Sequence, residues 1–499
     1  MLIRTSLALL TVAAWLATAA IPDRPEKLAF PELRYQPPDP SLHRTQLKSG
    51  PVAYIIPDRE LPLVTVQVTV RAGSYLDPVD RQGLASILGT LLVHGGTEEV
   101  SADALEERLA FLAASLSSAI GADSGTVSIN LLSKDLPEGL RILRDVLSRP
   151  RFQEDKLELR RQQTLQGLKQ RNDDSADIEA REIAALAHGP DFWAARNPTG
   201  SSITAITRQE LLTFHHKWFH PANFTLAVSG DFDRTAMIAQ LESLFEKWPF
   251  QGELPPPIPA VLHPAAPGVY VVDKDVPQGR VSILLSGVMR DDPSYPAIQM
   301  MNDILGGGGF TARIMNRVRS DEGLAYSAGS SFPGGNWFPS TFRAGFQSKS
   351  RTVAYASSIV LEEMQRMIEK PVTEEELRTA KRSFIDTFPE NFNTQSKVAA
   401  LFAREEFTGR FKKNPNFWKT YRQRLESVTI AEVQEAAIKH LHPDRVTLLV
   451  VGKKEEILKT HPDHPVRLET LSKGGIRDLP LRDPLTLQPL PSKTSDADR

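Results

Sequence analysis

The chain lacks cysteine throughout its 499 residues and carries no excess of charge of either sign. Without cysteine it can form no disulfide bond, no thiolate zinc site and no cysteine nucleophile. Its 59 lysines and arginines nearly balance 61 aspartates and glutamates, so the composition gives no reason to expect a nucleic acid partner. Apolar residues make up 41% of this long chain, which predicts a folded protein of at least two domains.

Long apolar runs are also scarce, and the N-terminal one is short. Arg4 precedes an apolar run at residues 7–16, and small residues follow at 17–19. This order is typical of a secretory signal peptide, and the run is short for a membrane span. We therefore expect residues 1–20 to be a signal peptide and the protein to be secreted across an inner membrane into a periplasm. An uncleaved N-terminal anchor is the alternative.

What the sequence does contain is an internal repeat. Residues 207–230 and 429–452 align without a gap when Thr207 is set on Thr429. Each copy begins with a T-x-x-E capping box, continues as a helix that ends at His-Pro, and closes with a T-L-x-V-x-G strand. A helix, a proline stop and a buried strand in matched register predict a duplicated α/β domain.

The boundaries of the two copies follow from composition. Residues 249–268 are rich in proline, which neither continues a helix nor donates to a sheet, so they are expected to link the domains. We place the domains at 40–248 and 269–470, and expect an extended or disordered tail at 471–499. Periodicity predicts strands at 53–56, 64–70, 127–132, 225–230, 281–285 and 447–452, and helices at 81–93, 102–114, 136–147, 154–172 and 295–304.

This order of segments resembles the pitrilysin/insulinase (inverzincin) zinc peptidases, especially the branch of the mitochondrial processing peptidase. The resemblance covers roughly residues 40–470. It rests on VTVRAGSYLDP, on GLA at a helix start, on GGTEEVSADALEERLAFLAASL, on NPTGSSITAITRQELLTFHHKWFHPANFTLAVSGDF and on LGGGGFTARIMNRVRSDEGLAYS. It implies an α+β fold of two homologous domains, each a mixed or antiparallel sheet with helices on one face, together forming a half-shell.

The resemblance fails at the residues that bind zinc. In active members the helix that begins with G-L-A carries H-x-x-E-H, in which two histidines bind the metal and the glutamate acts as general base. The equivalent positions here are Ser86, Gly89 and Thr90, and Gln166 stands where a later helix supplies a third, carboxylate ligand. No one of these four residues can replace imidazole or carboxylate. We therefore expect no metal, no cofactor and no catalysis in this chain alone.

Histidines elsewhere offer no replacement. No H-x-x-E-H occurs in the chain, and the paired histidines are either adjacent or separated by proline. Neither arrangement presents two ligands on one helix face, and no third ligand is evident. We assign no metal role to His94, His215, His216, His461 and His464, and a structural role at helix ends to His220 and His442.

The second half keeps a different part of the family pattern. By resemblance, Arg319 and Tyr326 lie near the scissile peptide and help to hold it, and both are suitable donors to a peptide carbonyl. A glycine run just before them, Gly306, Gly307, Gly308 and Gly309, matches a loop that contacts substrate in processing-peptidase relatives. No Lys-Ser/Thr follows it, so it is no Walker phosphate loop. An extended peptide could also add to a strand edge near 116–120.

These observations predict the non-catalytic subunit of a heterodimeric zinc peptidase. A paralogous partner with H-x-x-E-H would hold the zinc, and this chain would supply Arg319, Tyr326 and the glycine loop to a peptide or unfolded polypeptide substrate. A peptide-binding scaffold without a catalytic partner is the second hypothesis. A zinc peptidase with rearranged ligands is a third, which the four substitutions oppose.

Overall fold

The computed structural model describes residues 24, 28 and 35–491. The expected signal peptide at 1–20 therefore lies outside the described residues. The chain divides into two compact units, residues 1–36 and 37–499, and both sheets lie in the second. Within the described residues, no helix combines the length and the apolar character that a membrane span requires.

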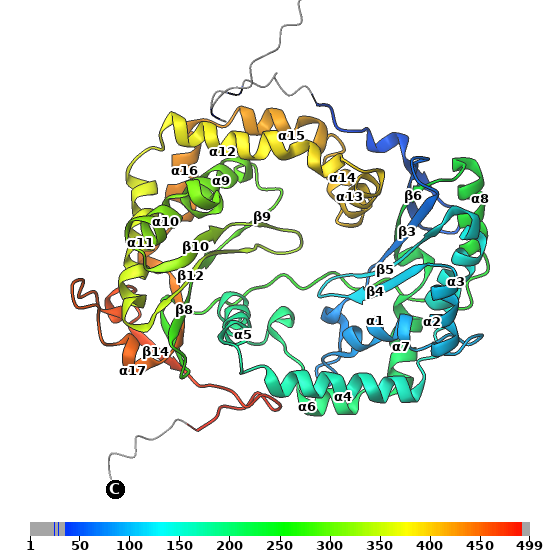
Figure 1. Ribbon diagram of the computed structural model, residues 1–499, viewed down its shortest axis with the longest axis horizontal. Coiled ribbons are helices and arrows are strands. Elements are labelled where there is room, and N and C mark those ends of the chain that lie inside the picture. Colours follow the sequence, from blue (N-terminus) through cyan, green and yellow to red (C-terminus); the bar gives the residue numbers. More distant parts are fainter. Residues whose placement is uncertain (1–23, 25–27, 29–34, 492–499) are drawn as a thin grey trace, which may run out of the picture. The chain divides into compact units, whose positions relative to one another are not determined.

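The first half of this unit is built on a six-stranded sheet with the order β1-β2-β6-β3-β5-β4 (Figure 1). Its strands are β1 (Arg44–Gln46), β2 (Val52–Pro57), β3 (Leu63–Val70), β4 (Ser115–Ile120), β5 (Gly125–Leu132) and β6 (Phe224–Gly230). Its helices are α1 (Leu84–His94), α2 (Ala102–Phe111), α3 (Leu136–Ser148), α4 (Glu154–Gln170), α5 (Ser175–His188), α6 (Gly200–Ala205), α7 (Arg208–Trp218) and α8 (Arg234–Phe245).

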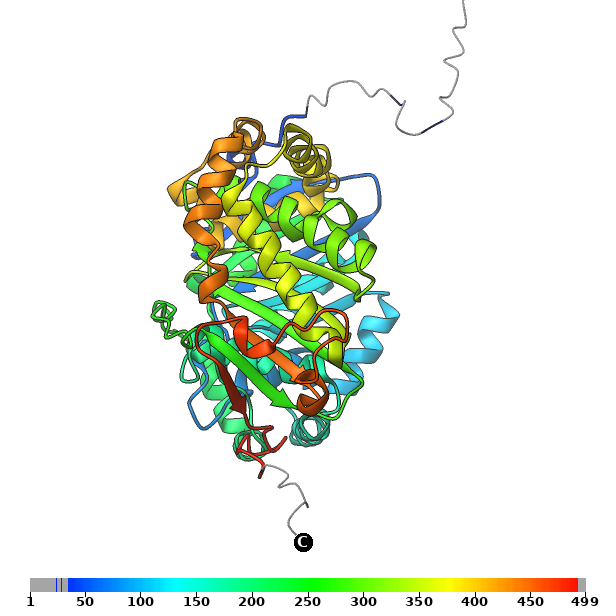
Figure 2. The same cartoon turned by 90° about the vertical axis from the view of Figure 1, so that its left-hand side faces the viewer.

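The second half repeats the design with the sheet order β10-β12-β8-β13-β7-β14. Its strands are β7 (Gly268–Asp273), β8 (Gln278–Ser286), β10 (Ala325–Ser331), β12 (Thr341–Lys349), β13 (Thr447–Gly452) and β14 (Ile476–Leu479), with a small parallel pair of β9 (Val288–Met289) and β11 (Gly334–Gly335). Its helices are α9 (Tyr295–Asn302), α10 (Arg313–Met315), α11 (Val353–Glu369), α12 (Glu374–Thr387), α13 (Gln395–Phe407), α14 (Arg410–Lys413), α15 (Phe417–Glu426), α16 (Ile430–His440) and α17 (Lys454–Ile457). Figure 2 shows the yellow and orange helices of this half over one face of its sheet.

The repeated segments hold equivalent places in the two sheets. β6 pairs in parallel with β2 and antiparallel with β3, and β13 pairs in parallel with β7 and antiparallel with β8. Both predicted capping boxes form, Thr207 with Glu210 and Thr429 with Glu432. The predicted α+β fold with two homologous mixed sheets is confirmed. The outermost strands differ, because β1 runs antiparallel to its neighbour whereas β14 runs parallel.

Several predicted boundaries shift for local reasons. The helix predicted at 102–114 ends at Phe111, because Ala113 adopts a φ of 47° and turns the chain into β4. The helix predicted at 295–304 is α-helical only to Asn302 and continues as a π-helix over Asp303–Gly307. Within the tail predicted at 471–499, β14 pairs with β7.

Each half has its core between its sheet and its own helices. β3 shows how the pattern arises, because Val64, Val66, Val68 and Val70 alternate with less buried residues and all face the first core. In the second half alternate residues of β13 face the two sides of the sheet: Leu448 and Val450 face the core, and Leu449 and Val451 pack with Ile178 of α5. The second sheet therefore carries a helix of the first half on its other face. In the same way α13 of the second half packs on β2 and β6 (Figure 1).

Candidate functional site

Helix α1 is the helix that would carry zinc ligands in an active relative. It begins after Gly83, whose φ of 101° favours glycine, and its apolar residues Leu84, Ile87, Leu88 and Leu91 are buried. The Asp77 carboxylate accepts hydrogen bonds from the backbone N–H groups of Gly83 and Ala85, each at 2.9 Å. Burial nevertheless raises the pKa of Asp77 to about 7, against the opposite effect of these two bonds. A buried carboxyl group thus fixes the start of the helix.

The ligand face of α1 carries no group that zinc prefers. Ser86 is exposed, and the Thr90 hydroxyl donates to the Ser86 carbonyl oxygen at 3.3 Å. Gly89 is buried, and a Cβ at that position would lie 2.7 Å from the backbone nitrogen of Ile120 in β4. Gln166 is exposed on α4. The position of the general base is therefore closed by the edge strand as well as empty of a side chain.

These residues do not fit a zinc ion. A catalytic zinc site needs three imidazole or carboxylate ligands with one open position, and two hydroxyls, an amide and a glycine supply none of them. In the part of the chain that the structure describes, no three His, Asp or Glu side chains are grouped to hold a metal ion.

The structure brings the predicted residues Arg319 and Tyr326 together. Arg319 lies in a π-helix (Asn316–Asp321), and its Cζ is 4.7 Å from the centre of the Tyr326 ring in β10. A third residue, Phe310, also contacts this guanidinium, with its ring centre 4.8 Å from the same atom. The guanidinium is thus in cation–π contact with two aromatic rings.

Both rings are unusually exposed for aromatic side chains. Phe310 is 67% exposed and Tyr326 is 83% exposed. Sequence reasoning missed Phe310, although the signal was present: it is the aromatic residue directly after the glycine run. Exposed aromatic groups clustered around a cation are typical of a surface that binds another chain.

The glycine run is more constrained than its composition indicates. A Cβ at Gly306 would overlap the backbone nitrogen of Ser330 in β10, so glycine lets the loop lie directly against the strand. A Cβ at Gly307 or Gly308 would meet the preceding helix at 2.7 Å or 2.9 Å. Only Gly309 of the four has open space around it, with a φ of 61° that turns the chain toward Phe310. Three of the four glycines therefore allow close packing, and the fourth allows a turn.

Tyr326 lies on an edge strand. β10 is the outermost strand of the second sheet, and its pairing with β12 is interrupted by a bulge between Ala325 and Ala328. The bulge changes the direction of the side chains of the residues it contains. A groove beside it is lined by residues of the glycine run, of β10 and of the neighbouring strands, among them Gly306, Gly307, Tyr326, Arg280 and Arg343. In the first half, β4 at 115–120 likewise lies at the sheet edge, where the sequence predicts peptide addition.

The histidines occupy structural positions. His215 is fully buried, its Nε2 lies 2.9 Å from the Leu147 carbonyl oxygen, and burial lowers its pKa to about 3. His220 Nε2 lies 2.8 Å from the Glu253 carbonyl oxygen, which ties the end of α7 to the linker. His464 stacks on Tyr355 with ring centres 3.9 Å apart, and His461 lies beside it.

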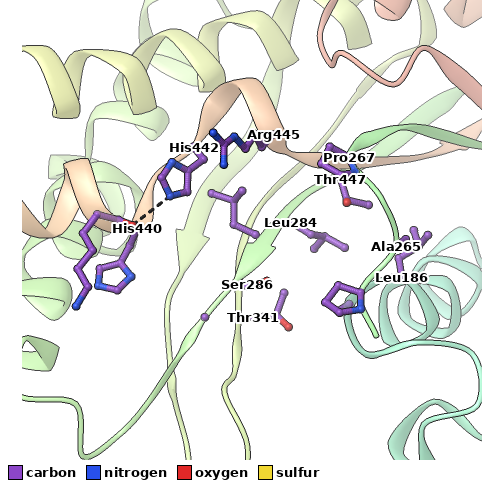
Figure 3. A pocket seen from close by; sticks show the side chains of 15 residues that line it. Leu186, Ala265, Pro267, Leu284, Ser286, Thr341, His440, His442, Arg445 and Thr447 are labelled. Carbon is purple, nitrogen blue, oxygen red and sulfur yellow. Dashed lines mark hydrogen bonds between the residues drawn. The ribbon is translucent and has the colours of Figure 1, made fainter. Parts of the chain in front are cut away.

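A cavity beside the end of α16 contains two further histidines (Figure 3). His442 Nε2 lies 3.1 Å from the Lys439 carbonyl oxygen, and the His440 ring meets Phe332 edge-on at 6.0 Å. Burial and the nearby Lys439 lower the pKa of His440. No carboxylate lines this cavity, so its two histidines lack the further ligand that zinc requires.

Comparisons with known proteins agree with this geometry. The model of the insulinase family (peptidase family M16) matches residues 55–188, and the model described as the peptidase M16 inactive domain matches residues 205–384. An uncharacterised zinc protease of Mycobacterium tuberculosis is 26% identical over 432 residues, covering 84% of this chain and 96% of the relative. A non-peptidase homologue of Helicobacter pylori is 24% identical over 400 residues, covering 79% of this chain and 90% of the relative.

A solved structure shows the same fold. The crystal structure of a peptidase M16 inactive domain from Pseudomonas fluorescens superposes with a TM-score of 0.73 at 22% identity, covering 84% of this chain and 99% of that one. Sequence models from one family thus match both halves, and the duplicated sheets have the family fold. The chain belongs to the pitrilysin/insulinase family of peptidases (peptidase family M16), as a homologue without the zinc-binding residues of its active members.

Proposed function

We propose that this chain binds extended polypeptide as the non-catalytic subunit of a heterodimeric zinc peptidase. The proposal is carried by one observation: Phe310, Arg319 and Tyr326 form an exposed cluster at the free edge of the second sheet. An edge strand offers unpaired backbone groups to an extended peptide, while guanidinium and phenol donate to its carbonyl oxygens. The cluster is thus equipped to hold a peptide without cleaving it.

The zinc ligands and the general base that are missing from the first half indicate what a partner must supply. Gly89 meets β4, and Ser86, Thr90 and Gln166 offer no imidazole or carboxylate, so hydrolysis needs a zinc helix from another chain. We propose a paralogous subunit with H-x-x-E-H as that chain. The non-peptidase homologue of Helicobacter pylori among the relatives supports a role for this fold without catalysis of its own.

We also propose that the mature protein acts after secretion, in a periplasm. The support is the order of Arg4, the apolar run at 7–16 and the small residues at 17–19. N-terminal sequencing of protein recovered from cell fractions tests this. A mature N-terminus beyond residue 16 in the periplasmic fraction would support it, and an intact Met1 in the cytosol would contradict it.

Co-purification from the native cell tests the main proposal. The partner captured with this chain is identified by mass spectrometry, and zinc content and peptide hydrolysis are measured for each subunit and for the mixture. We expect zinc and the H-x-x-E-H motif in the partner only, and hydrolysis that rises when this chain is added. Arg319→Ala should reduce this increase in hydrolysis. Arg141→Ala, at an exposed position on α3 of the first half, is the control and should leave the increase unchanged.

Two outcomes would contradict the proposal in different ways. Stoichiometric zinc in the isolated chain, with hydrolysis that chelators abolish, would show a zinc peptidase with rearranged ligands. Peptide binding with no zinc-bearing partner in the captured material would show a scaffold protein.

A further inference from the structure

A second cavity of the C-terminal half lies between α9, the α13–α14 segment and α15 (Figure 1). It shares no lining residue with the groove beside Tyr326. Its walls combine aromatic side chains, Tyr295, Phe417, Trp418 and Tyr421, with an unusual number of cations. Nothing in the proposed peptide-binding role uses these residues.

The lining carries more positive than negative charge. The cations are Arg290, Arg404, Arg410, Lys413 and Arg424, and the anions are Asp291, Asp292 and Glu405. Each carboxylate is already engaged. Glu405, which is 1% exposed, is shared by Arg290 at 3.4 Å and Arg410 at 3.2 Å, and Asp291 lies 3.5 Å from Arg410 and 3.3 Å from Lys413.

The remaining cations have no such partner. Asp292 accepts from the backbone N–H and the hydroxyl of Ser294, and neither Arg404 nor Arg424 forms an ion pair with any carboxylate that the structure describes. Burial lowers the pKa of Arg290 and of Arg424, and the charge of Arg410 lowers each further. A lowered pKa means that the charged form of the arginine is disfavoured. The carboxylates of the protein therefore do not fully compensate these positive charges.

Buried hydrogen-bond donors without a partner are further evidence that this cavity lacks acceptors. Four buried side-chain N–H groups of the lining form no hydrogen bond among the described atoms: Nε of Arg290, Arg410 and Arg424, and Nε1 of Trp418. Nε of Arg290 and Nε of Arg410 still lie 3.9 Å and 3.5 Å from Asp291 Oδ1, whereas Nε of Arg424 forms no ion pair with a described carboxylate. All four are donors, and no acceptor of the lining is left unpaired in the same way. The Arg290 and Arg410 side chains are only 9% and 10% exposed, so bulk water does not readily satisfy them. A buried donor without a partner is destabilising, and a bound acceptor would remove that cost.

We propose that this cavity binds a small dianionic oxyanion, either inorganic phosphate or the phosphate group of a monoester. Such a group only accepts hydrogen bonds and carries two charges, which matches a site with excess donors and two cations that lack a carboxylate. Guanidinium groups suit it because their planar forks donate two bonds to neighbouring oxygens. The aromatic walls would give a monoester with a flat apolar group a second contact, which free phosphate lacks.

Isothermal titration calorimetry with inorganic phosphate and with phenyl phosphate tests the proposal on the full chain. Arg424→Gln is the informative variant, because Arg424 pairs with no carboxylate and its loss leaves no acid uncompensated. Its Nη2 donates to the Phe417 carbonyl oxygen at 3.1 Å, a bond that glutamine can partly replace. Lys419→Gln removes the same charge from an exposed position on the same helix and serves as the matched control.

We expect saturable binding of one phosphate group per chain, at least tenfold weaker in Arg424→Gln and unchanged in Lys419→Gln. Trp418→Phe, which keeps an aromatic ring but removes the N–H group, should weaken binding to a smaller degree and guards against a folding defect in the first variant. Tighter binding of phenyl phosphate would identify a monoester as the ligand, and equal binding would identify free phosphate. Binding no stronger than that of chloride at equal ionic strength, or equal losses in Arg424→Gln and Lys419→Gln, would overturn the proposal.

Discussion

Gly89 of α1 lies against Ile120 of β4 so closely that a Cβ on the glycine would be 2.7 Å from the Ile120 backbone nitrogen. In the second half Gly306 has the same relation to Ser330 of β10. Each half thus has a glycine where the helical segment that follows β3 or β8 meets the edge strand of its sheet, β4 or β10. In the first half this contact occupies the place of the general base, so a larger side chain at position 89 would require the edge strand to move.

Gly89→Ala should destabilise the protein. Overpacking at a close backbone contact costs about 1–3 kcal/mol, and an added Cβ at Gly89 has no flexible side chain to displace. Chemical denaturation measures the change. Gly167→Ala in α4 is the control, because nothing lies within 4 Å of its Cβ and alanine favours the helix by about 0.5–1 kcal/mol. Equal effects of the two substitutions would contradict the close contact.

Phe310→Ala should weaken peptide binding without a loss of stability. Phe310 is 67% exposed and contacts Arg319, so its removal takes away binding surface and little core packing. Peptide affinity is measured by fluorescence anisotropy, and the thermal midpoint by calorimetry. Phe111→Ala is a matched control, since that exposed ring also lies under an arginine, Arg108, at 4.9 Å but away from the site. Equal losses of affinity would place the peptide elsewhere.

Asp77→Asn should change how stability depends on pH. The folded pKa of about 7 lies above the unfolded value, so the folded state binds more protons between pH 4 and 7. The stability contributed by the protonated carboxyl is therefore lost as pH rises through that range, by up to about 1.4 kcal/mol per pH unit. Urea unfolding from pH 4 to 7 should show a flatter decline in the variant. An unchanged slope would show that Asp77 does not titrate in this range.

His215→Gln should remove a dependence of opposite sign. Burial holds the folded pKa of His215 at about 3, below its ordinary 6.5, so the unfolded state binds more protons between these values. Stability is therefore lost as pH falls from 6.5 toward 3, and the neutral glutamine should reduce that loss. The same urea series measures it, with the exposed His216→Gln as the control. Equal acid sensitivity of the two variants would contradict the assignment.

Glu179→Gln should lower the free energy of unfolding by weakening the contact between α5 of the first half and the second sheet. This nearly buried α5 carboxylate accepts from the Ser282 hydroxyl at 2.7 Å and pairs with Arg343 at 3.1 Å, both on the second sheet. Because Arg343 is 43% exposed, the loss of this half-buried pair and of the charge-assisted bond from Ser282 should cost about 1–3 kcal/mol. Glu362→Gln, which loses an exposed pair with Arg317, is the control and should cost at most about 1 kcal/mol. Denaturation midpoints distinguish the two.

Local patterns in the sequence determined a large part of the fold. The capping boxes at Thr207 and Thr429, the His-Pro stops and the strands after them depend on neighbours within a few residues, so their positions could be predicted from spacing alone. The emptied ligand face of α1 was visible for the same reason, because residues three and four apart share a helix face. Arg319 and Tyr326 were found through the family pattern.

Contacts between distant segments were decided only by the tertiary structure. Phe310 contacts Arg319 because Gly306 lets the loop lie on β10, and no periodic pattern in the sequence predicts this contact. The close approach of Gly89 to Ile120 depends on the path of β4, and the paired charges of Glu179 and Arg343 depend on a helix of one half crossing the sheet of the other. The excess of cations around Arg424 and its unpaired Nε likewise arise only after folding, because folding gathers these arginines around one cavity and removes a donor from water.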